Sequence, residues 1–143
     1  DLFQTKLIIV QGDTQSSFVG GYTGFYNKIK VAHIEAGLRT NNKLSPFPEE
    51  INRQAVSLIS DFDFTPTEET KSNLIKLGKK EVYNVGNTVI DALLYIKDKI
   101  ALKKDIYFKK YSDINFFKKI VLITGHRREN FGTPFENVLN SIK

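Results

Sequence analysis

Short apolar runs alternate with longer stretches of helical character over the first 85 residues. Residues 7–10 (LIIV) are wholly apolar and rich in β-branched side chains, which is typical of a strand buried on both faces of a parallel sheet. Further strands are predicted at 31–36, 62–65 and 81–85, with helices at 15–27, 48–60 and 66–78 between the four strands. This alternation predicts an α/β fold with a parallel sheet and helices on both faces.

The ends of these predicted elements carry suitable residues. Gly12 allows a tight turn after the first strand, and Asp13 or Thr14 can cap the helix that follows. Pro48 suits the first position of the second helix, and Gly78 is a natural residue to end the third. The local signals therefore agree with the hydrophobic pattern.

The pattern changes near Gly86. Thr88 and Asp91 have the spacing of a capping box, and an apolar stripe over 89–100 predicts a helix after it. Residues 103–119 are polar and aromatic, and no element is predicted there. Residues 120–124 (IVLIT) predict another buried strand, and a further helix is predicted from 132 to 143. We therefore expect one α/β domain over 1–86 and the start of a second over 87–143.

Composition narrows the classes of protein that fit. A chain of 143 residues can bury one modest core. There is no Met and the first residues lead directly into an apolar run, so we expect an internal piece of a longer protein. The absence of Cys excludes disulfides, thiolate catalysis and Cys-ligated zinc within these residues. No run of about 18 apolar residues occurs, so no membrane association is expected.

The positive charge is spread along the chain. The net charge is +5, and its excess comes from scattered lysine pairs such as Lys79–Lys80 and Lys103–Lys104. A nucleic-acid-binding protein would gather such charge on one face, so a solvated surface is favoured over nucleic-acid contact. In contrast with 17 Lys, there are four Arg, and these lie with both His in motif-like stretches: Arg39, Arg53, Arg127, Arg128, His33 and His126. The guanidinium fork binds phosphate or carboxylate bidentately, so a charged ligand is expected there.

Three carboxylates are candidates for acid–base chemistry. Asp13, Glu35 and Glu49 are each predicted at a strand end or a helix start on one side of the first domain, where open α/β sheets bind their ligands. Carboxylates gathered in one place can act as general acid and base. The alternative is structural: Asp13 caps a helix, Glu49 complements a helix dipole, and Glu35 pairs with Arg39 or Arg53.

Residues 125–130 (GHRREN) indicate an anion site. A glycine turn, the imidazole of His126 and the guanidiniums of Arg127 and Arg128 precede a predicted helix and suit a diphosphate. The alternative is a structural Arg–Glu pair at the end of a strand. Two histidines far apart do not make a zinc site, so no metal is expected. No G-x-G-x-x-G occurs, so no nicotinamide cofactor is expected either.

Six motifs occur in a specific order: 11–14 (QGDT), 33–40 (HIEAGLRT), 45–53 (SPFPEEINR), 64–67 (FTPT), 85–91 (VGNTVID) and 124–130 (TGHRREN). Together they resemble the bacterial non-hydrolysing UDP-N-acetylglucosamine 2-epimerases, over nearly the whole chain except 103–119. The resemblance implies the glycosyltransferase-B-like fold, in which the active site lies between two Rossmann-like domains. Residues 1–86 would be the C-terminal part of the first domain, and 87–143 the start of the second, nucleotide-binding domain.

The resemblance also implies a reaction and its residues. The sugar is inverted at C2 by anti elimination of UDP and re-addition through 2-acetamidoglucal, giving UDP-N-acetylmannosamine without a cofactor or metal. Asp13, Glu35 and Glu49 match the acid–base carboxylates, and His126 matches a nucleotide-contacting histidine. Arg127 matches a contact to a second, regulatory UDP-N-acetylglucosamine, and Arg128 and Arg39 are further expected UDP-sugar contacts.

The same resemblance implies the setting of the protein. We expect a cytoplasmic homodimer that serves cell-surface polysaccharide synthesis. The expected family strands before Asp1 and the uridine-binding half-domain after Lys143 would be missing, so this piece alone is expected to be inactive. The alternatives are a glycosyltransferase of the same fold, an epimerase of a 2,3-diacetamido sugar nucleotide, a hydrolysing epimerase, and a non-catalytic remnant.

Overall fold

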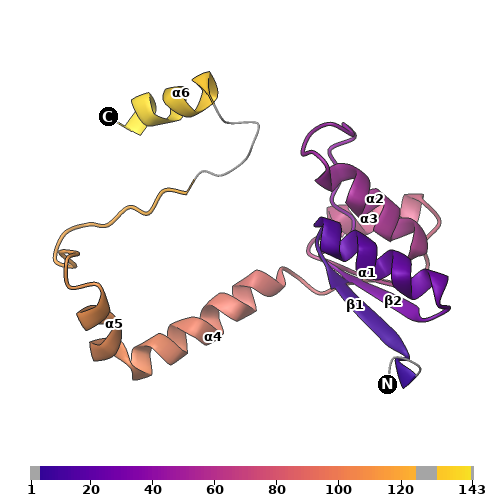
Figure 1. Cartoon of the computed structure of the whole chain (residues 1–143), viewed down its shortest axis with the longest axis horizontal. Helices are drawn as coiled ribbons and strands as arrows, with labels where there is room; N and C mark the ends of the chain where they lie inside the picture. Colours follow the sequence, from indigo (N-terminus) through magenta and orange to yellow (C-terminus); the bar gives the residue numbers. More distant parts are fainter. Residues whose placement is uncertain (1–3, 125–131, 143) are drawn as a thin grey trace. The chain divides into compact units, whose positions relative to one another are not determined.

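The structure is a computed structural model that describes residues 4–124 and 132–142 (Figure 1). The chain divides into two compact units, Asp1–Ala92 and Leu93–Lys143. Among the described residues, no helix has both the length and the apolar character needed to cross a membrane.

The first unit contains a four-stranded parallel sheet in the order β1-β2-β3-β4. The strands are β1 (Leu7–Gln11), β2 (Lys30–Ile34), β3 (Phe62–Thr65) and β4 (Val82–Asn84). The connecting helices are α1 (Gln15–Tyr26), α2 (Glu49–Ile59) and α3 (Glu68–Lys76). The predicted strand–helix alternation and the parallel sheet are confirmed, with boundaries shifted by a few residues at most.

One face of this sheet carries the core. The register pairs Val10 with His33, His33 with Asp63, and Asp63 with Val82, so these four side chains share a face. Phe18 of α1 and Val56 of α2 pack near Val10 on that face, and Leu74 of α3 packs against Val82. All three helices therefore cover the same face of the sheet.

The opposite face is open at β1. Leu7 and Ile9 are 43% and 62% exposed, so the prediction of a strand buried on both faces is wrong in this structure. The expectation of helices on both faces is also wrong for the described part of the sheet. The reason is topological: each crossover leads to the next neighbouring strand with the same right-handed sense, which places every connecting helix on one side.

Helix ends follow the predicted chemistry with small differences. Thr14, and not Asp13, caps α1: its Oγ1 accepts a hydrogen bond from the Ser17 amide at 3.2 Å. Pro48 lies at the position just before α2, where the sequence predicted it inside the first turn. Thr67 and Thr70 form a reciprocal capping box at α3. Because Thr14 supplies the cap, the Asp13 carboxylate is not used at the helix end and pairs with Arg53.

The described chain after β4 contains helices joined by turns and irregular segments. It contains α4 (Thr88–Leu102), α5 (Lys104–Lys110) and α6 (Thr133–Ile142). The Asn87 side chain accepts from the Val89 amide at 3.0 Å, so Asn87 acts at the start of α4, where a Thr88–Asp91 box was expected. Residues 120–124 do not form a strand, because none of the described residues pairs with them. The predicted strand is therefore wrong in this structure.

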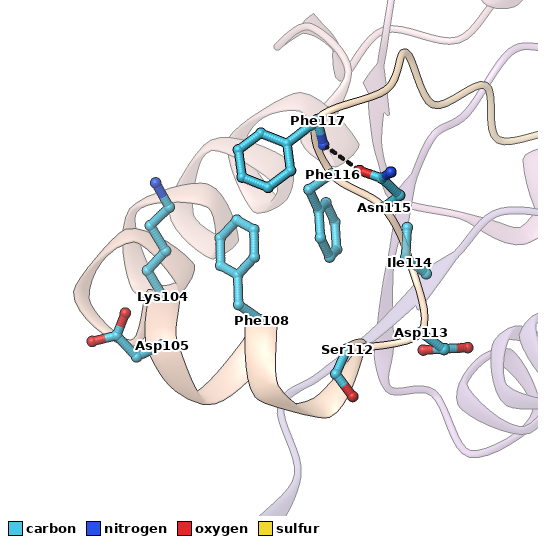
Figure 2. Close-up of a pocket in the computed structure, with 9 residues that line it drawn as sticks. All are labelled: Lys104, Asp105, Phe108, Ser112, Asp113, Ile114, Asn115, Phe116 and Phe117. Carbon is cyan, nitrogen blue, oxygen red and sulfur yellow. Dashed lines mark hydrogen bonds between the residues drawn. The ribbon is translucent and has the colours of Figure 1, made fainter.

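Aromatic side chains from α5 and the segment after it gather in the region where no element was predicted. The rings of Phe108 and Phe116 lie edge to face, with centroids 4.6 Å apart. Figure 2 shows them with Phe117, whose amide donates to the Asn115 side chain at 3.0 Å. These residues border a surface hollow together with Lys104, Asp105 and 112–114. Phe117 remains fully exposed, so this cluster buries little apolar surface.

Candidate active site

The carboxyl ends of β1 and β2 meet at one edge of the sheet. Gly12 follows β1 and donates its amide to the Ile34 carbonyl of β2 at 2.9 Å. Gly12 has φ +67°, and a Cβ at this position would lie 3.6 Å from Glu35 Oε2. The Glu35 carboxylate therefore lies against the turn that carries Asp13. The structure brings these two predicted residues together at the edge where open α/β sheets bind ligands.

The turn that carries Asp13 is held by side chains from three elements. Three successive carbonyls each accept one hydrogen bond, and the donors come from α1, β2 and α2. These pairs are Ser17 Oγ to Gln11 O at 2.5 Å, His33 Nε2 to Gly12 O at 2.8 Å, and Asn52 Nδ2 to Asp13 O at 2.9 Å. Hydrogen bonds from three elements therefore hold the backbone of residues 11–13, which carries the Asp13 carboxylate.

Arg53 of α2 links the Asp13 carboxylate to a second acid. Its Nη2 lies 2.6 Å from Asp13 Oδ2, and its Nη1 lies 3.6 Å from Glu50 Oε2. Both Arg53 and Glu50 are buried. The alternative in which Glu35 pairs with Arg39 or Arg53 is not supported, because no salt bridge joins them within the described residues. Arg53 pairs with Asp13 and Glu50 instead.

Glu50 also orders the loop before α2. Its two carboxylate oxygens accept from the Thr40 amide at 3.1 Å and the Asn41 amide at 3.2 Å, and Gln54 donates at 2.7 Å. Glu50 was not among the carboxylates predicted for the site from the sequence. Its helical spacing with the buried residues Arg53 and Ser57 was the available signal.

These contacts set the charge state of Glu50. Burial alone would raise the pKa of its carboxyl, but the hydrogen bonds from Gln54, Thr40 and Asn41 outweigh burial and hold the pKa below its ordinary value of 4.5. Glu50 is thus a buried carboxylate that is charged at neutral pH. It connects Arg53 to the backbone of the loop.

A pH dependence of stability follows from this lowered pKa. The folded protein binds a proton at Glu50 less readily than the unfolded chain. The contribution of Glu50 to the unfolding free energy is therefore complete above its pKa in the unfolded chain, and it is lost as pH falls through its pKa in the folded protein. We expect the difference in unfolding free energy between wild type and Glu50→Gln to shrink as pH is lowered below about 4.5. Urea unfolding at several pH values measures it, with Glu69→Gln on the exposed side of α3 as control. A difference that stays constant down to pH 3 would contradict this role.

The structure gives fewer contacts for the other predicted site residues. Glu49 lies in the first turn of α2 and is partly exposed. Arg39 donates to the Leu38 carbonyl at 2.7 Å and to Ser57 Oγ at 3.0 Å, and burial lowers its pKa. These contacts hold Arg39 against α2, and its expected contact with a UDP-sugar stays a prediction. His126, Arg127 and Arg128 lie outside the described residues, so their predicted roles are not tested.

His33 is a buried residue to which the sequence analysis gave no role. Beside it lies Asp63, also buried, with 3.8 Å between His33 Nδ1 and Asp63 Oδ1. Asp63 accepts from Ser60 Oγ at 2.7 Å and pairs with Lys79 Nζ at 3.2 Å. The sequence predicted a strand at 62–65, but the pairing of Asp63 with His33 depends on strand register, which the sequence alone does not give.

Comparisons with known proteins decide the family. A family model described as UDP-N-acetylglucosamine 2-epimerase matches residues 2–143. The chain belongs to this epimerase family. A Campylobacter jejuni UDP-N-acetylglucosamine 2-epimerase is 45% identical to it over 149 residues, which cover 99% of this chain and 39% of that protein. The family resemblance noted from the six motifs is thereby confirmed.

Solved structures of epimerases confirm the fold class. The crystal structure of UDP-GlcNAc 2-epimerase from Neisseria meningitidis bound to UDP-GlcNAc is 42% identical, with a TM-score of 0.88 over 96% of this chain and 38% of that one. The Methanocaldococcus jannaschii UDP-GlcNAc 2-epimerase in complex with UDP-GlcNAc and UDP is 36% identical, with a TM-score of 0.83 over 99% and 39% of the two chains. The glycosyltransferase-B-like α/β class holds, and this chain spans less than two fifths of the length of these relatives.

Proposed function

We propose that the complete protein containing this chain interconverts UDP-N-acetylglucosamine and UDP-N-acetylmannosamine. The observation that carries the proposal is the meeting of Asp13 and Glu35 at the Gly12 turn, in a chain of the epimerase family. Two structural neighbours are described as bound to UDP-GlcNAc, which supports a UDP-sugar as the ligand here.

The proposed reaction has two stages. A carboxylate removes the proton from C2 while the C1–O bond to UDP breaks on the opposite face, and C1=C2 forms in 2-acetamidoglucal. UDP oxygen then adds back to C1, and an acid returns a proton to the other face of C2. This route needs acid–base groups on both faces of the sugar, and Asp13, Glu35 and Glu49 are proposed for them.

Departure of UDP requires cationic and hydrogen-bonding groups at the diphosphate. We assign this role to His126, Arg127, Arg128 and Arg39. Arg127 is also proposed to contact a second, regulatory UDP-N-acetylglucosamine. We also propose a division into two domains at residues 86/87.

The backbone at Glu35 supports a functional role for this residue. Glu35 has φ +65°, in the left-handed region that residues with a Cβ seldom adopt. Such conformations cost free energy and cluster at active sites, where the surrounding structure maintains them. Here the strained residue directly follows β2 and directs its carboxylate toward Gly12.

The proposed setting is a cytoplasmic homodimer that supplies cell-surface polysaccharide synthesis. The isolated chain is proposed to be inactive, because it spans less than two fifths of the length of its relatives. Turnover by the isolated 143 residues would contradict this part of the proposal.

The decisive experiment uses the complete protein with UDP-N-acetylglucosamine in D2O, followed by proton NMR. We expect deuterium at C2 together with a new UDP-N-acetylmannosamine signal. Folded protein that binds UDP but shows neither result would overturn the epimerase proposal. Release of UDP that depends on an acceptor would then indicate a glycosyltransferase, and exchange only with a 2,3-diacetamido sugar nucleotide would indicate that relative.

A further inference from the structure

Gly12 is bonded to β2 through both of its peptide groups. Its amide donates to the Ile34 carbonyl at 2.9 Å, and its carbonyl accepts from His33 Nε2 at 2.8 Å. Asp13 is the next residue after Gly12, and Glu35 is the next residue after Ile34. The two hydrogen bonds therefore join the residue before Asp13 to the end of the strand that precedes Glu35, and one of them depends on the His33 side chain.

The geometry fixes the tautomer of His33. A carbonyl oxygen can only accept, so Nε2 must carry the proton that it donates to Gly12. Nδ1 has no hydrogen-bond partner within the described residues and lies 3.8 Å from Asp63 Oδ1. Burial lowers the pKa of His33 despite the opposing effects of the Gly12 hydrogen bond and of Asp63. The ring is therefore neutral near pH 7.

The far side of the ring is also held in place. Asp63 is fully buried and is fixed by Ser60 and Lys79, so it cannot turn away from His33. The ring itself is fully buried between β1 and β3. His33 thus forms a rigid support beneath the Gly12 turn, without a position from which it could itself reach a ligand.

We propose that His33 is a positioning residue of the epimerase, which sets the distance between the Asp13 and Glu35 carboxylates by holding the Gly12 carbonyl. The inference rests on the proposed function of these two carboxylates. It concerns the chemical step more than binding, because the groups proposed to hold UDP lie elsewhere in the chain. A displacement of about 1 Å at reacting groups can cost on the order of 10²-fold in rate.

The test compares two substitutions in the complete protein. His33→Gln keeps an amide donor at about the reach of Nε2, whereas His33→Leu keeps the bulk and removes the donor. We expect His33→Leu to lower kcat about 10- to 100-fold with KM for UDP-N-acetylglucosamine changed less than about twofold. His33→Gln should restore most of kcat. Val82→Ala in β4 is the control, because it opens the core on the same face of the sheet without touching the turn.

Each outcome decides a specific point. If the wild-type protein shows no exchange at C2 in D2O, the proposed function is wrong, regardless of the results for the variants. Active wild type with an equally active His33→Leu would overturn the positioning role of His33. Equal losses in His33→Leu, His33→Gln and Val82→Ala would also overturn it, because general destabilisation would then explain them. If His33→Leu does not fold, His33→Asn takes its place, since its amide is too short to reach the Gly12 carbonyl.

Discussion

Glu35→Gln is expected to lower kcat for epimerisation by about 10²- to 10⁴-fold, the usual contribution of a general acid or base. Glutamine has nearly the same shape but cannot take or give a proton at C2. Its amide can still lie against the Gly12 turn, where Glu35 Oε2 lies now, so UDP-sugar binding should persist. The measurement is the steady-state rate together with incorporation of deuterium at C2.

Glu35→Gly separates catalysis from stability at the same position. Glycine adopts φ +65° readily, whereas a residue with a Cβ pays roughly 1 kcal/mol for it. We therefore expect this variant to lose activity as Glu35→Gln does, while its melting temperature is unchanged or higher. Glu69→Gln in α3 is the matched control for loss of a carboxylate and should be fully active. A destabilised Glu35→Gly with normal kcat would mean that Glu35 supports the fold and not the reaction.

The sequence predicted most of the first unit because its local signals agree with one another. The strand at 62–65 was predicted with the bounds that the structure gives to β3, where alternating residues are bounded by Asp61 and Pro66. Asp13 and Glu35 were placed on one side of the domain because both follow parallel strands. These inferences needed only local patterns and the geometry of parallel sheets.

What the sequence did not predict depends on long-range geometry. The open face at Leu7 and Ile9 follows from the strand order, which the pattern of residues 7–10 does not contain. The adjacent acids Glu49 and Glu50 look alike in sequence, but the packing of α2 buries Glu50 and leaves Glu49 partly exposed. Residues 120–124 look like a strand by composition, but a strand also needs a neighbour with which to pair.

Arg53→Met is expected to lower the unfolding free energy by about 3–5 kcal/mol, the usual cost of removing one partner from a buried ion pair. Methionine replaces much of the apolar stem but leaves the buried Glu50 carboxylate without its cation and Asp13 without its 2.6 Å partner. Urea unfolding at pH 7 measures the loss. Arg39→Met is the matched control: Arg39 bonds to the Leu38 carbonyl and Ser57 Oγ, and its loss should cost about 1 kcal/mol.

The double variant Glu50→Gln, Arg53→Met tests whether the cost comes from the stranded charge. In the Glu50→Gln background the side chain at position 50 carries no charge. Removal of the Arg53 guanidinium then no longer leaves a buried carboxylate there without a cation, so part of the lost unfolding free energy should be recovered. We expect the double variant to lose about 1–3 kcal/mol less unfolding free energy than the sum of the two single losses. Strictly additive losses would show that Arg53 acts through packing or through Asp13 alone. Recovered stability without recovered kcat would be the informative combination, because it would assign the Glu50 contact to the fold and the Asp13 contact to the reaction.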